Sequence, residues 1–342
     1  MAGKRTTIKD IAEALGLSVA TVSRALTDSW EVSKKTRAAV LEMAEKLNYH
    51  PNSQARGLVT RRSNTVGLVV PDLLTSTYFA TVAKSIQPIL MDRGYHLLIT
   101  QSDESPAEER RLLRMLQDIN VDGIIVSTST DADHNRDIFN ELLSEGTALV
   151  FVSRVCHKVK APKIVIDNKA MAERVVRHLI DQGCKQIVHI AGPKGIRPSL
   201  EREQGYRKAL EAHRISLDER LVVPAGLFEK DGAKAMHGIL DAGLLPDAVF
   251  AFNDTVAFGA MKEIKRRGLR IPQDIAVAGF SNSFAATIIE PPLTTVAQPL
   301  PEMGKLAAEL LLRQLDGFEA PDKTVILDSE LIIRASSLKA SM

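Results

Sequence analysis

The stretch SVATVSRAL, residues 18–26, holds side chains suited to chemistry near the start of the chain. With Ser18 as the N-cap of a short helix, the helical period turns Val22 and Leu26 inward. The same period leaves an outward face of small, hydroxyl and basic side chains: Val19, Ala20, Thr21, Ser23 and Arg24. A guanidinium group can donate two hydrogen bonds to guanine, and small apolar side chains can contact the thymine methyl group. The residue types on this face therefore predict that the helix contacts DNA. The alternative is an ordinary helical hairpin with solvated polar groups.

The elements that would position this face are two further short helices. Thr7 can cap the first helix with Asp10 as its capping-box partner, and Gly16 can end it. Two helices joined through GLS have the geometry of a helix-turn-helix, whose second helix enters the major groove. Thr7, Thr21 and Ser23 are then expected to contact phosphates, together with the helix N-terminal amides, and Ser18 at the start of the second helix is expected to contact DNA as well. A third helix is expected after Ser33, and Pro51 ends it.

The segment NSQARGLVTRRSN, residues 52–64, has helix-forming potential but little apolar surface. A short helix of this kind is marginal in water, so we expect a linker that orders on contact. Residues 1–62 contain 11 Lys or Arg and 6 Asp or Glu, whereas the remainder contains 33 and 36. A basic N-terminal segment before a slightly acidic remainder indicates that the N-terminal segment binds an anionic polymer. The alternative is a chance imbalance of charges on solvated helix faces.

Composition and motifs exclude several classes of protein. The chain has 342 residues and two cysteines, Cys156 and Cys184, so neither a disulfide framework nor a structural zinc site is expected. The polar start and the absence of an 18-residue apolar run predict a cytoplasmic protein without signal peptide or membrane span. No P-loop, GxGxxG after the first strand, GxSxG or HExxH occurs, and the histidines lack metal-ligand spacing. We therefore expect no enzyme activity, no cofactor and no metal.

From Val66 onward, short apolar runs alternate with helical stretches. The runs include VGLVV, YHLLIT, GIIVS, ALVFV, KIVID, IVHIAG, LVVPA, AVFAF and IAVAGF. Strands that are apolar throughout and alternate with amphipathic helices indicate parallel sheets covered by helices on both faces. A break near SRVCHKVKAPK, residues 153–163, predicts two similar α/β lobes. The tail TVILDSELIIRASSL, residues 324–338, is expected to add one strand.

The N-terminal stretch from TIKDIAEALGLSVATVSRAL to PNSQARGL closely resembles the lactose/galactose-repressor (LacI/GalR) family of transcription factors. Other segments resemble that family's landmarks in the family's order: NTVGLVVPDL, VDGIIV, HLIDQGCKQIVHIAGP, FAFNDTVAFGAMKEIKRRGLRIPQDIAVAGF and PPLTTVAQP. The resemblance covers the whole chain. It implies that Val19, Ala20 and Arg24 read bases in double-stranded operator DNA. It also implies a homodimer and a hinge helix that contacts DNA through Asn52, Ala55 and Leu58. Leu58 would wedge into a central base step, or else dock on the body as a linker residue.

The resemblance further implies a periplasmic-sugar-binding-like body with a small effector between its lobes. The residues that match effector-contacting positions are Tyr78, Phe79, Ser153, Arg154, Arg202, Phe228, Asn253, Asp254 and Ser281. Helix-start packing for the first two, and helix capping for Asn253 and Asp254, are the structural alternatives. Ser153 and Ser281 replace common aspartates, and Pro198 replaces a common serine or threonine. With Arg154 and Arg202 near the cleft, a sugar acid or sugar phosphate is expected beside plain sugars.

The expected fold class is α/β, with an all-α helix-turn-helix headpiece and hinge helix before a two-lobed body of parallel sheets flanked by helices. The expected domains are 1–50 for DNA binding, 51–63 for the hinge and 64–342 for effector binding and dimerisation. Lobe 1 would span 64–158 and 293–320, and lobe 2 would span 159–292 and 321–340. The predicted function is a ligand-controlled repressor. The alternatives are a sugar-transport solute-binding protein and a sugar-metabolising enzyme.

Overall fold

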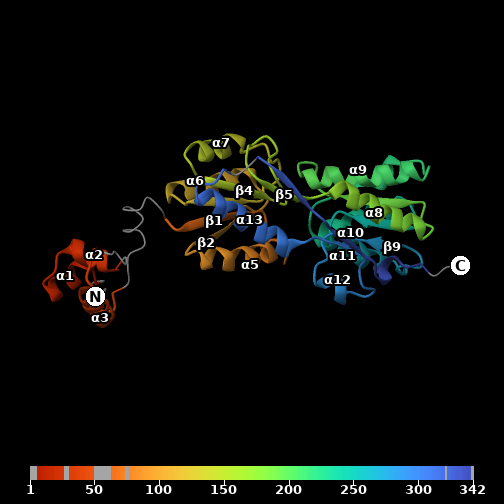
Figure 1. Cartoon of the computed structure of the whole chain (residues 1–342). Coiled ribbons are helices and arrows are strands. Elements are labelled where there is room, and N and C mark those ends of the chain that lie inside the picture. Colours follow the sequence, from red (N-terminus) through yellow and green to blue (C-terminus); the bar gives the residue numbers. More distant parts are fainter. Residues whose placement is uncertain (1–5, 27–30, 50–62, 74–76, 320–321, 340–342) are drawn as a thin grey trace. The chain divides into compact units, whose positions relative to one another are not determined.

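The structure is a computed structural model that describes residues 6–26, 31–49, 63–73, 77–319 and 322–339. The chain divides into two compact units, residues 1–63 and 64–342 (Figure 1). Within these described ranges, no helix is long and apolar enough to cross a membrane. Each unit is described by itself below.

The first unit contains the three expected helices, α1 (Ile8–Leu15), α2 (Val19–Leu26) and α3 (Lys34–Lys46). The ends of α1 are capped by the residues that the sequence predicts. The Asp10 carboxylate accepts from the Thr7 backbone amide at 2.7 Å, and Gly16 ends the helix with φ 63°. Glycine adopts this left-handed conformation without a Cβ penalty. One apolar cluster joins the helices through the buried side chains of Ile11, Ala12, Val22, Ala25, Val40 and Ala44. This small core fixes which face of α2 remains outside.

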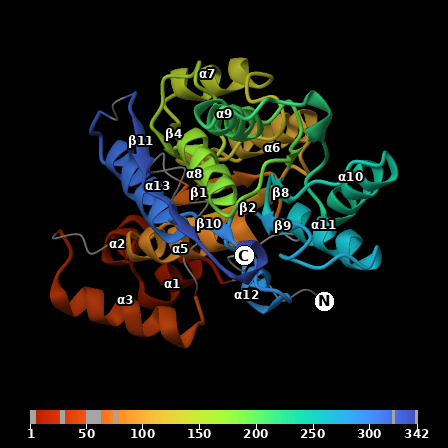
Figure 2. The same cartoon turned by 90° about the vertical axis from the view of Figure 1, so that its right-hand side faces the viewer.

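The second unit begins with a six-stranded parallel sheet in the order β11-β5-β4-β3-β1-β2. Its strands are β1 (Thr65–Val70), β2 (His96–Gln101), β3 (Gly123–Val126), β4 (Ala148–Val152), β5 (Lys163–Ile166) and β11 (Thr324–Leu327). Its helices are α5 (Thr77–Asp92), α6 (Pro106–Asp118), α7 (Arg136–Ser144) and α13 (Leu300–Leu315). Figures 1 and 2 show α6 and α7 on one face of the sheet and α5 on the other, where α13 packs beside α5.

A second parallel sheet has the order β7-β6-β8-β9. Its strands are β6 (Ile187–Ala191), β7 (Val222–Pro224), β8 (Ala248–Ala251) and β9 (Ala276–Ala278). Two helix pairs cover it: α8 (Asn168–Asp181) with α9 (Arg197–Ala212), and α10 (Glu229–Asp241) with α11 (Asp254–Arg266). Helix α9 lies tightly on α8, since a Cβ at Gly205 would sit 2.3 Å from the Lys169 carbonyl oxygen. This close packing fixes where Arg202 of α9 lies.

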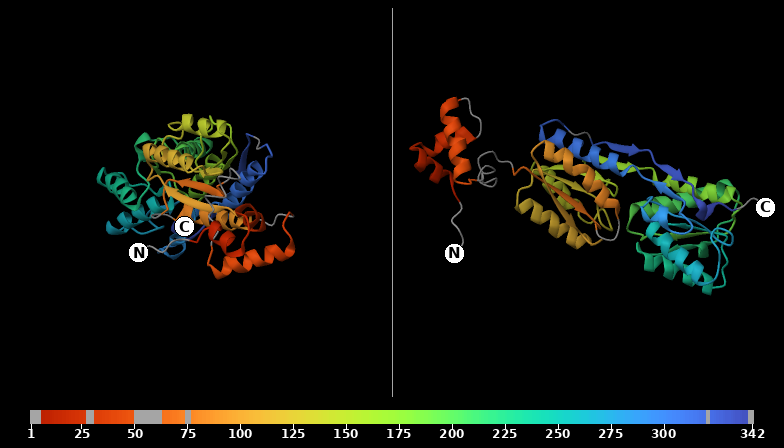
Figure 3. Two further views of the ribbon diagram at one scale, coloured as in Figure 1. Left: turned by 90° about the vertical axis from the view of Figure 1, so that its left-hand side faces the viewer. Right: turned by 90° about the horizontal axis from the view of Figure 1, so that it is seen from below.

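The remaining short elements join the two lobes or lie beside the second sheet. They are η1 (Glu219–Leu221), α12 (Ala285–Ile288), β10 (Thr295–Ala297), β12 (Glu330–Ile332) and η2 (Ala335–Ser337). Strands β10 and β12 form an antiparallel pair. The right-hand view of Figure 3 shows the C-terminal segment, in blue, running along both lobes.

The strand pairing corrects three expectations. Strands β5 and β11 hydrogen-bond within the first sheet, so the chain crosses to the second lobe after Ile166 and after Leu327, not near 158 and 320. The tail forms two strands in different sheets instead of one, and β10 was not expected at all. The break at 153–163 is a loop inside the first lobe, because it connects two neighbouring strands of one sheet.

Candidate functional site

The outer face of α2 carries the side chains that the sequence assigned to base contacts. Val19 is 42% exposed, and Ala20, Ser23 and Arg24 are also exposed. The Arg24 Nε lies 3.0 Å from Oε2 of Glu31, a neighbour that sequence reasoning did not identify. Both side chains are more than two-fifths exposed, so solvent screens this ion pair. Arg24 can therefore leave Glu31 for an acceptor on DNA at little cost in free energy.

The hydroxyl groups near α2 also serve the local helix structure. The Ser18 hydroxyl oxygen accepts from the Thr21 amide at 3.0 Å and shares a 2.8 Å hydrogen bond with the Thr21 hydroxyl. The Thr7 hydroxyl donates to the Asp10 carboxylate at 2.7 Å. The Ser18 hydroxyl therefore caps α2, and the Thr7 and Thr21 hydroxyls are already engaged in local hydrogen bonds. Any phosphate contact has to coexist with these bonds. Three other residues assigned to DNA contact, Asn52, Ala55 and Leu58, lie outside the described residues.

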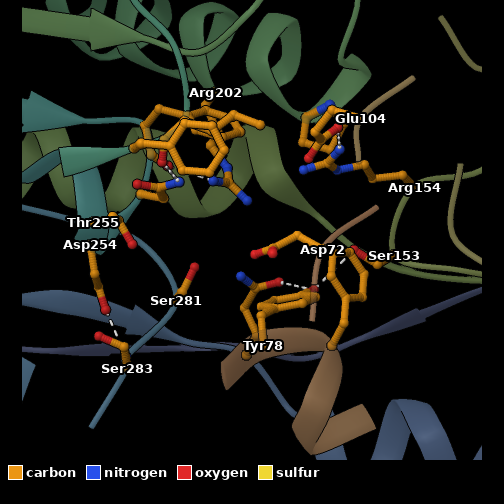
Figure 4. A pocket seen from close by; sticks show the side chains of 17 residues that line it. Asp72, Tyr78, Glu104, Ser153, Arg154, Arg202, Asp254, Thr255, Ser281 and Ser283 are labelled. Carbon is orange, nitrogen blue, oxygen red and sulfur yellow. Dashed lines mark hydrogen bonds and ion pairs between the residues drawn. The ribbon is translucent and has the colours of Figure 1, made fainter. Parts of the chain in front are cut away.

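In the second unit, loops at the carboxyl ends of the strands meet around one pocket between the lobes (Figure 4). All nine residues assigned to ligand contact lie among the 17 that line it. Tyr78, Phe79, Ser153 and Arg154 come from the first lobe, and Arg202, Phe228, Asn253, Asp254 and Ser281 come from the second. The carboxyl edge of a parallel sheet is the usual ligand site of such folds.

The first-lobe wall is ordered by Tyr78. Its hydroxyl lies 3.0 Å from the Ser153 hydroxyl and donates to Oε1 of Gln298 at 2.9 Å. The ring meets that of Phe79 edge to face, with centroids 4.9 Å apart. Burial raises the pKa of the Tyr78 phenol, which therefore stays protonated. Ser153 has φ 67°, so its backbone is held in a conformation that serine rarely adopts.

Arg154 has its charge balanced within the first lobe. Its Nη1 lies 2.6 Å from Oε2 of Glu104, and both side chains are less than one-fifth exposed. The guanidinium also lies 5.9 Å from the centroid of the Phe79 ring. The sequence analysis used the charge of Arg154 near the cleft as a reason to expect an acidic ligand. The pairing with Glu104 weakens that reason, since a contacting carboxylate offsets most of the cation's field.

Arg202 is a buried cation on the second-lobe wall. Its Nε and Nη2 donate to Oδ1 of Asn168 at 3.1 and 2.9 Å, and its Nη1 donates to the Phe252 carbonyl at 2.5 Å. The guanidinium lies 3.6 Å from the centroid of the Phe280 ring. Among the described residues, the hydrogen-bond acceptors of Arg202 are thus neutral oxygens. Burial lowers the pKa of Arg202 to about 9, because the charged form has lost its water.

Asn253 and Asp254 line the pocket but also hold the second lobe together. Asn253 is the N-cap of α11, accepting from the Val256 amide at 2.8 Å. One Asp254 oxygen accepts from the Ser283 amide at 2.7 Å, and the other accepts from the Thr295 hydroxyl. Burial raises the pKa of the Asp254 carboxyl. The capping alternative is therefore confirmed for Asn253, whereas the Asp254 carboxylate binds the Ser283 and Thr295 groups instead of capping a helix. Any ligand would share groups that already have partners.

Two further residues give the pocket shape. Phe228 is 37% exposed at the start of α10, where it offers an aromatic face. Ser281 has φ 133°, and its amide donates to the Val296 carbonyl at 3.0 Å. Side chains that sequence reasoning did not assign to the ligand complete the lining: Asp72, Glu104, Pro198, Leu227, Phe252, Thr255, Ser283 and Gln298. Asp72, Glu104, Phe252 and Gln298 follow strand ends closely, which was a signal in the sequence that could have identified them.

Comparison with known proteins gives consistent assignments for both units. Residues 7–52 match the family of bacterial regulatory proteins, lacI family, and residues 176–337 match a periplasmic binding protein-like domain. The ribose operon repressor of Halalkalibacterium halodurans is 33% identical, covering 95% of this chain and 97% of its own. The repressor CytR of Escherichia coli K12 is 33% identical over 97% of this chain and 96% of its own.

Solved structures resemble the whole chain as well. A complex of the transcriptional regulator CelR with cellobiose is 32% identical, with a TM-score of 0.74 over 97% of this chain and 100% of that one. A Lac repressor dimer bound to operator and an anti-inducer is 25% identical, with a TM-score of 0.87 over 98% of this chain and 100% of that one. Full-length matches above 30% identity, together with an exposed recognition helix and an interlobe pocket, show that this chain belongs to the LacI family of bacterial regulatory proteins and is a DNA-binding transcriptional regulator.

Proposed function

We propose that the protein represses transcription by binding an operator, and that a small polar ligand in the interlobe pocket controls its operator affinity. The observation that carries this proposal is the composition of the pocket: side chains from both lobes line it. A ligand that contacts both lobes binds one lobe arrangement better than another. Such differential binding is what allows a ligand to shift a conformational equilibrium.

For the DNA, the proposed base contacts are Val19, Ala20 and Arg24 on α2. Thr7, Ser18, Thr21 and Ser23 are proposed to hold phosphates, and Asn52, Ala55 and Leu58 to contact the minor groove from the hinge. The protein would act in the cytoplasm as a homodimer on a pseudo-palindromic operator. In that arrangement two α2 helices reach half-sites related by the same twofold axis. The Lac repressor is a dimer on operator DNA in its solved complex, which supports this assembly.

For the ligand, the proposed class is a sugar or sugar derivative, contacted by the nine residues assigned above. Hydroxyl, amide, carboxylate and guanidinium groups around the pocket can hydrogen-bond to the hydroxyl groups of a sugar. The aromatic ring of Phe228 can contact the apolar face of the sugar ring. The pairing of Arg154 with Glu104 reduces the case for a strongly acidic ligand, while Arg202 retains capacity for one negative group. Relatives named for ribose and bound to cellobiose support the sugar class.

The test begins with calorimetry on the purified full-length protein against ribose, cellobiose, glucuronate and glucose 6-phosphate. An operator selected from random duplexes is then titrated with protein in the presence and absence of the sugar that binds. We expect binding of at least one sugar and a shift in operator affinity. A bound sugar that leaves operator affinity unchanged would contradict the proposed control by the ligand.

A further inference from the structure

The shortest connection between the two lobes lies in contact with residues that line the ligand pocket. Strand β5 ends at Ile166 in the first sheet, and α8 begins at Asn168 against the second. A single residue, Asp167, separates them, and its carboxylate caps α8 by accepting from the Ala170 amide at 2.8 Å. Asn168 is therefore the first residue that belongs to the second lobe after this crossover.

Asn168 is only 5% exposed, and both the oxygen and the nitrogen of its side-chain amide have hydrogen-bond partners. Its Oδ1 accepts two hydrogen bonds from Arg202, and its Nδ2 donates to Oε2 of Glu201 at 3.1 Å. Because a guanidinium group only donates and a carboxylate only accepts, the orientation of the amide is fixed by its partners. A neutral amide is thus inserted between a buried cation and an anion.

The crossover also contacts the first-lobe wall of the pocket. The Ser153 amide donates to the Ile164 carbonyl of β5 at 2.8 Å, and the Ser153 hydroxyl pairs with that of Tyr78. The chain from Ile164 to Asn168 therefore joins a pocket residue of the first lobe to Arg202 of the second. A change at either wall reaches this segment through directly contacting groups.

We propose that Asn168 is a positioning residue that holds Arg202 toward the ligand and couples occupancy of the pocket to the crossover between the lobes. This inference rests on the proposed function, since it assigns a role in the same site. It predicts two separate losses when the Asn168 amide is removed. The ligand binds more weakly because Arg202 is less well fixed, and a saturating ligand changes operator affinity less because the coupling is weakened.

The first variant is Asn168→Ala, compared with Lys169→Ala, an exposed position in the same helical turn. Loss of hydrogen bonds to a charged partner should weaken sugar binding about 10- to 100-fold in Asn168→Ala. The ratio of operator affinities without and with saturating sugar should also shrink toward one. Lys169→Ala should keep both the sugar affinity and this ratio of the parent protein within about 2-fold.

A second pair of variants separates positioning from a general loss of stability. Asn168→Asp keeps an oxygen toward Arg202 but turns the other oxygen toward the Glu201 carboxylate, so like charges meet. Adding Glu201→Gln replaces that carboxylate with an amide that can donate to the newly introduced carboxylate. The double variant should recover the affinity for the neutral sugars and their operator ratio to within about 3-fold of the parent, whereas Asn168→Asp alone should not. Neither variant should recover binding of glucuronate or glucose 6-phosphate, because the new carboxylate offsets the charge of Arg202.

The probes are the four sugars named above, measured by calorimetry and by operator titration. Parent-like binding and response in Asn168→Ala would overturn the inference and leave the proposed function intact. Weaker binding with a full operator response at saturation would overturn the coupling role, as would failure of the double variant to recover. If the parent protein binds a sugar but its operator affinity does not change, the proposed function fails and the inference fails with it. Binding of none of the four sugars by the parent protein would likewise contradict both.

Discussion

At the residue scale, the two arginines of the pocket differ in how their charges are balanced. Arg154 contacts Glu104, whereas the oxygens that accept from Arg202 in the described part of the chain belong to an amide and a carbonyl. A buried cation beside neutral dipoles gains most from a ligand oxygen, because the low dielectric strengthens that contact. Arg202 is therefore the residue on which ligand recognition depends most in our account.

We expect Arg202→Ala to abolish the response of operator binding to sugar. The alanine removes the donor group and leaves the Asn168 amide oxygen and the Phe252 carbonyl without this partner. Calorimetry should show sugar binding weakened by about 2–5 kcal/mol, the range for truncating one partner of a buried charged contact. Arg220→Ala, an exposed arginine paired with Asp218 away from the pocket, is the control. Parent-like sugar affinity in Arg202→Ala would remove Arg202 from the site.

For the DNA, we expect Arg24→Ala to weaken operator binding by about 1–3 kcal/mol while random duplex binding changes little. A bidentate contact to guanine is lost only at the specific site, and the exposed pair with Glu31 offers little resistance to forming it. Titrations at one fixed salt concentration check this, with Lys46→Ala on α3 as a charge-matched control. Equal losses on both duplexes would mean that Arg24 contacts phosphate.

The residue types of the site were readable from the sequence, but their partners were not. Eight of the nine assigned positions follow a strand or begin a helix at the carboxyl edge of one of the two sheets, and Arg202 lies in the second turn of α9. Glu104 comes from the loop after β2, and the sequence contains nothing that pairs it with Arg154. The backbone conformations of Ser153 and Ser281, which have φ 67° and 133°, are likewise set by tertiary contacts.

At the element scale, periodicity predicted strands and helices better than it predicted their grouping. Apolar runs such as ALVFV and AVFAF became β4 and β8 because a strand buried on both faces carries apolar residues throughout. The sequence analysis assigned β5 to the wrong lobe. The composition of the preceding loop, residues 153–163, does not distinguish a loop within a lobe from a connection between lobes. β10 was missed because three residues, Thr295–Ala297, give no periodicity to detect.

The second sheet contains a histidine that should make stability depend on pH. His189 on β6 is fully buried between Tyr206 and Phe250, and burial lowers its pKa to about 4. The unfolded chain takes up a proton near pH 6.5, but the folded chain does so only near the lower value. Stability therefore falls as the pH drops through this window, by a contribution on the order of 3 kcal/mol.

Urea unfolding at several pH values between 7 and 4 measures this slope. His189→Gln should lose much of the dependence on pH in that window, whereas exposed His96→Gln should keep it. The comparison concerns slopes, so a uniform loss of stability from altered packing does not affect it. The same slope in His189→Gln and the parent protein would show that other groups cause the acid sensitivity.

At the scale of the whole molecule, binding of sugar and binding of DNA are linked. If sugar changes operator affinity by some factor, operator must change sugar affinity by the same factor, because both follow one equilibrium between states. The pocket supplies the differential contact, since residues of both lobes line it. The β5–α8 crossover, with Asn168 at its end, is where we place the link inside the body.

The measurement that tests this account most directly is an operator titration with the full-length protein, followed by fluorescence anisotropy with and without a saturating sugar identified by calorimetry. We predict a change in operator affinity of about 5- to 150-fold for the parent protein, together with the reciprocal change in sugar affinity on operator-bound protein. Arg202→Ala should show no change in operator affinity. A parent protein that binds the sugar in the pocket, yet has the same operator affinity at every sugar concentration, would contradict the account.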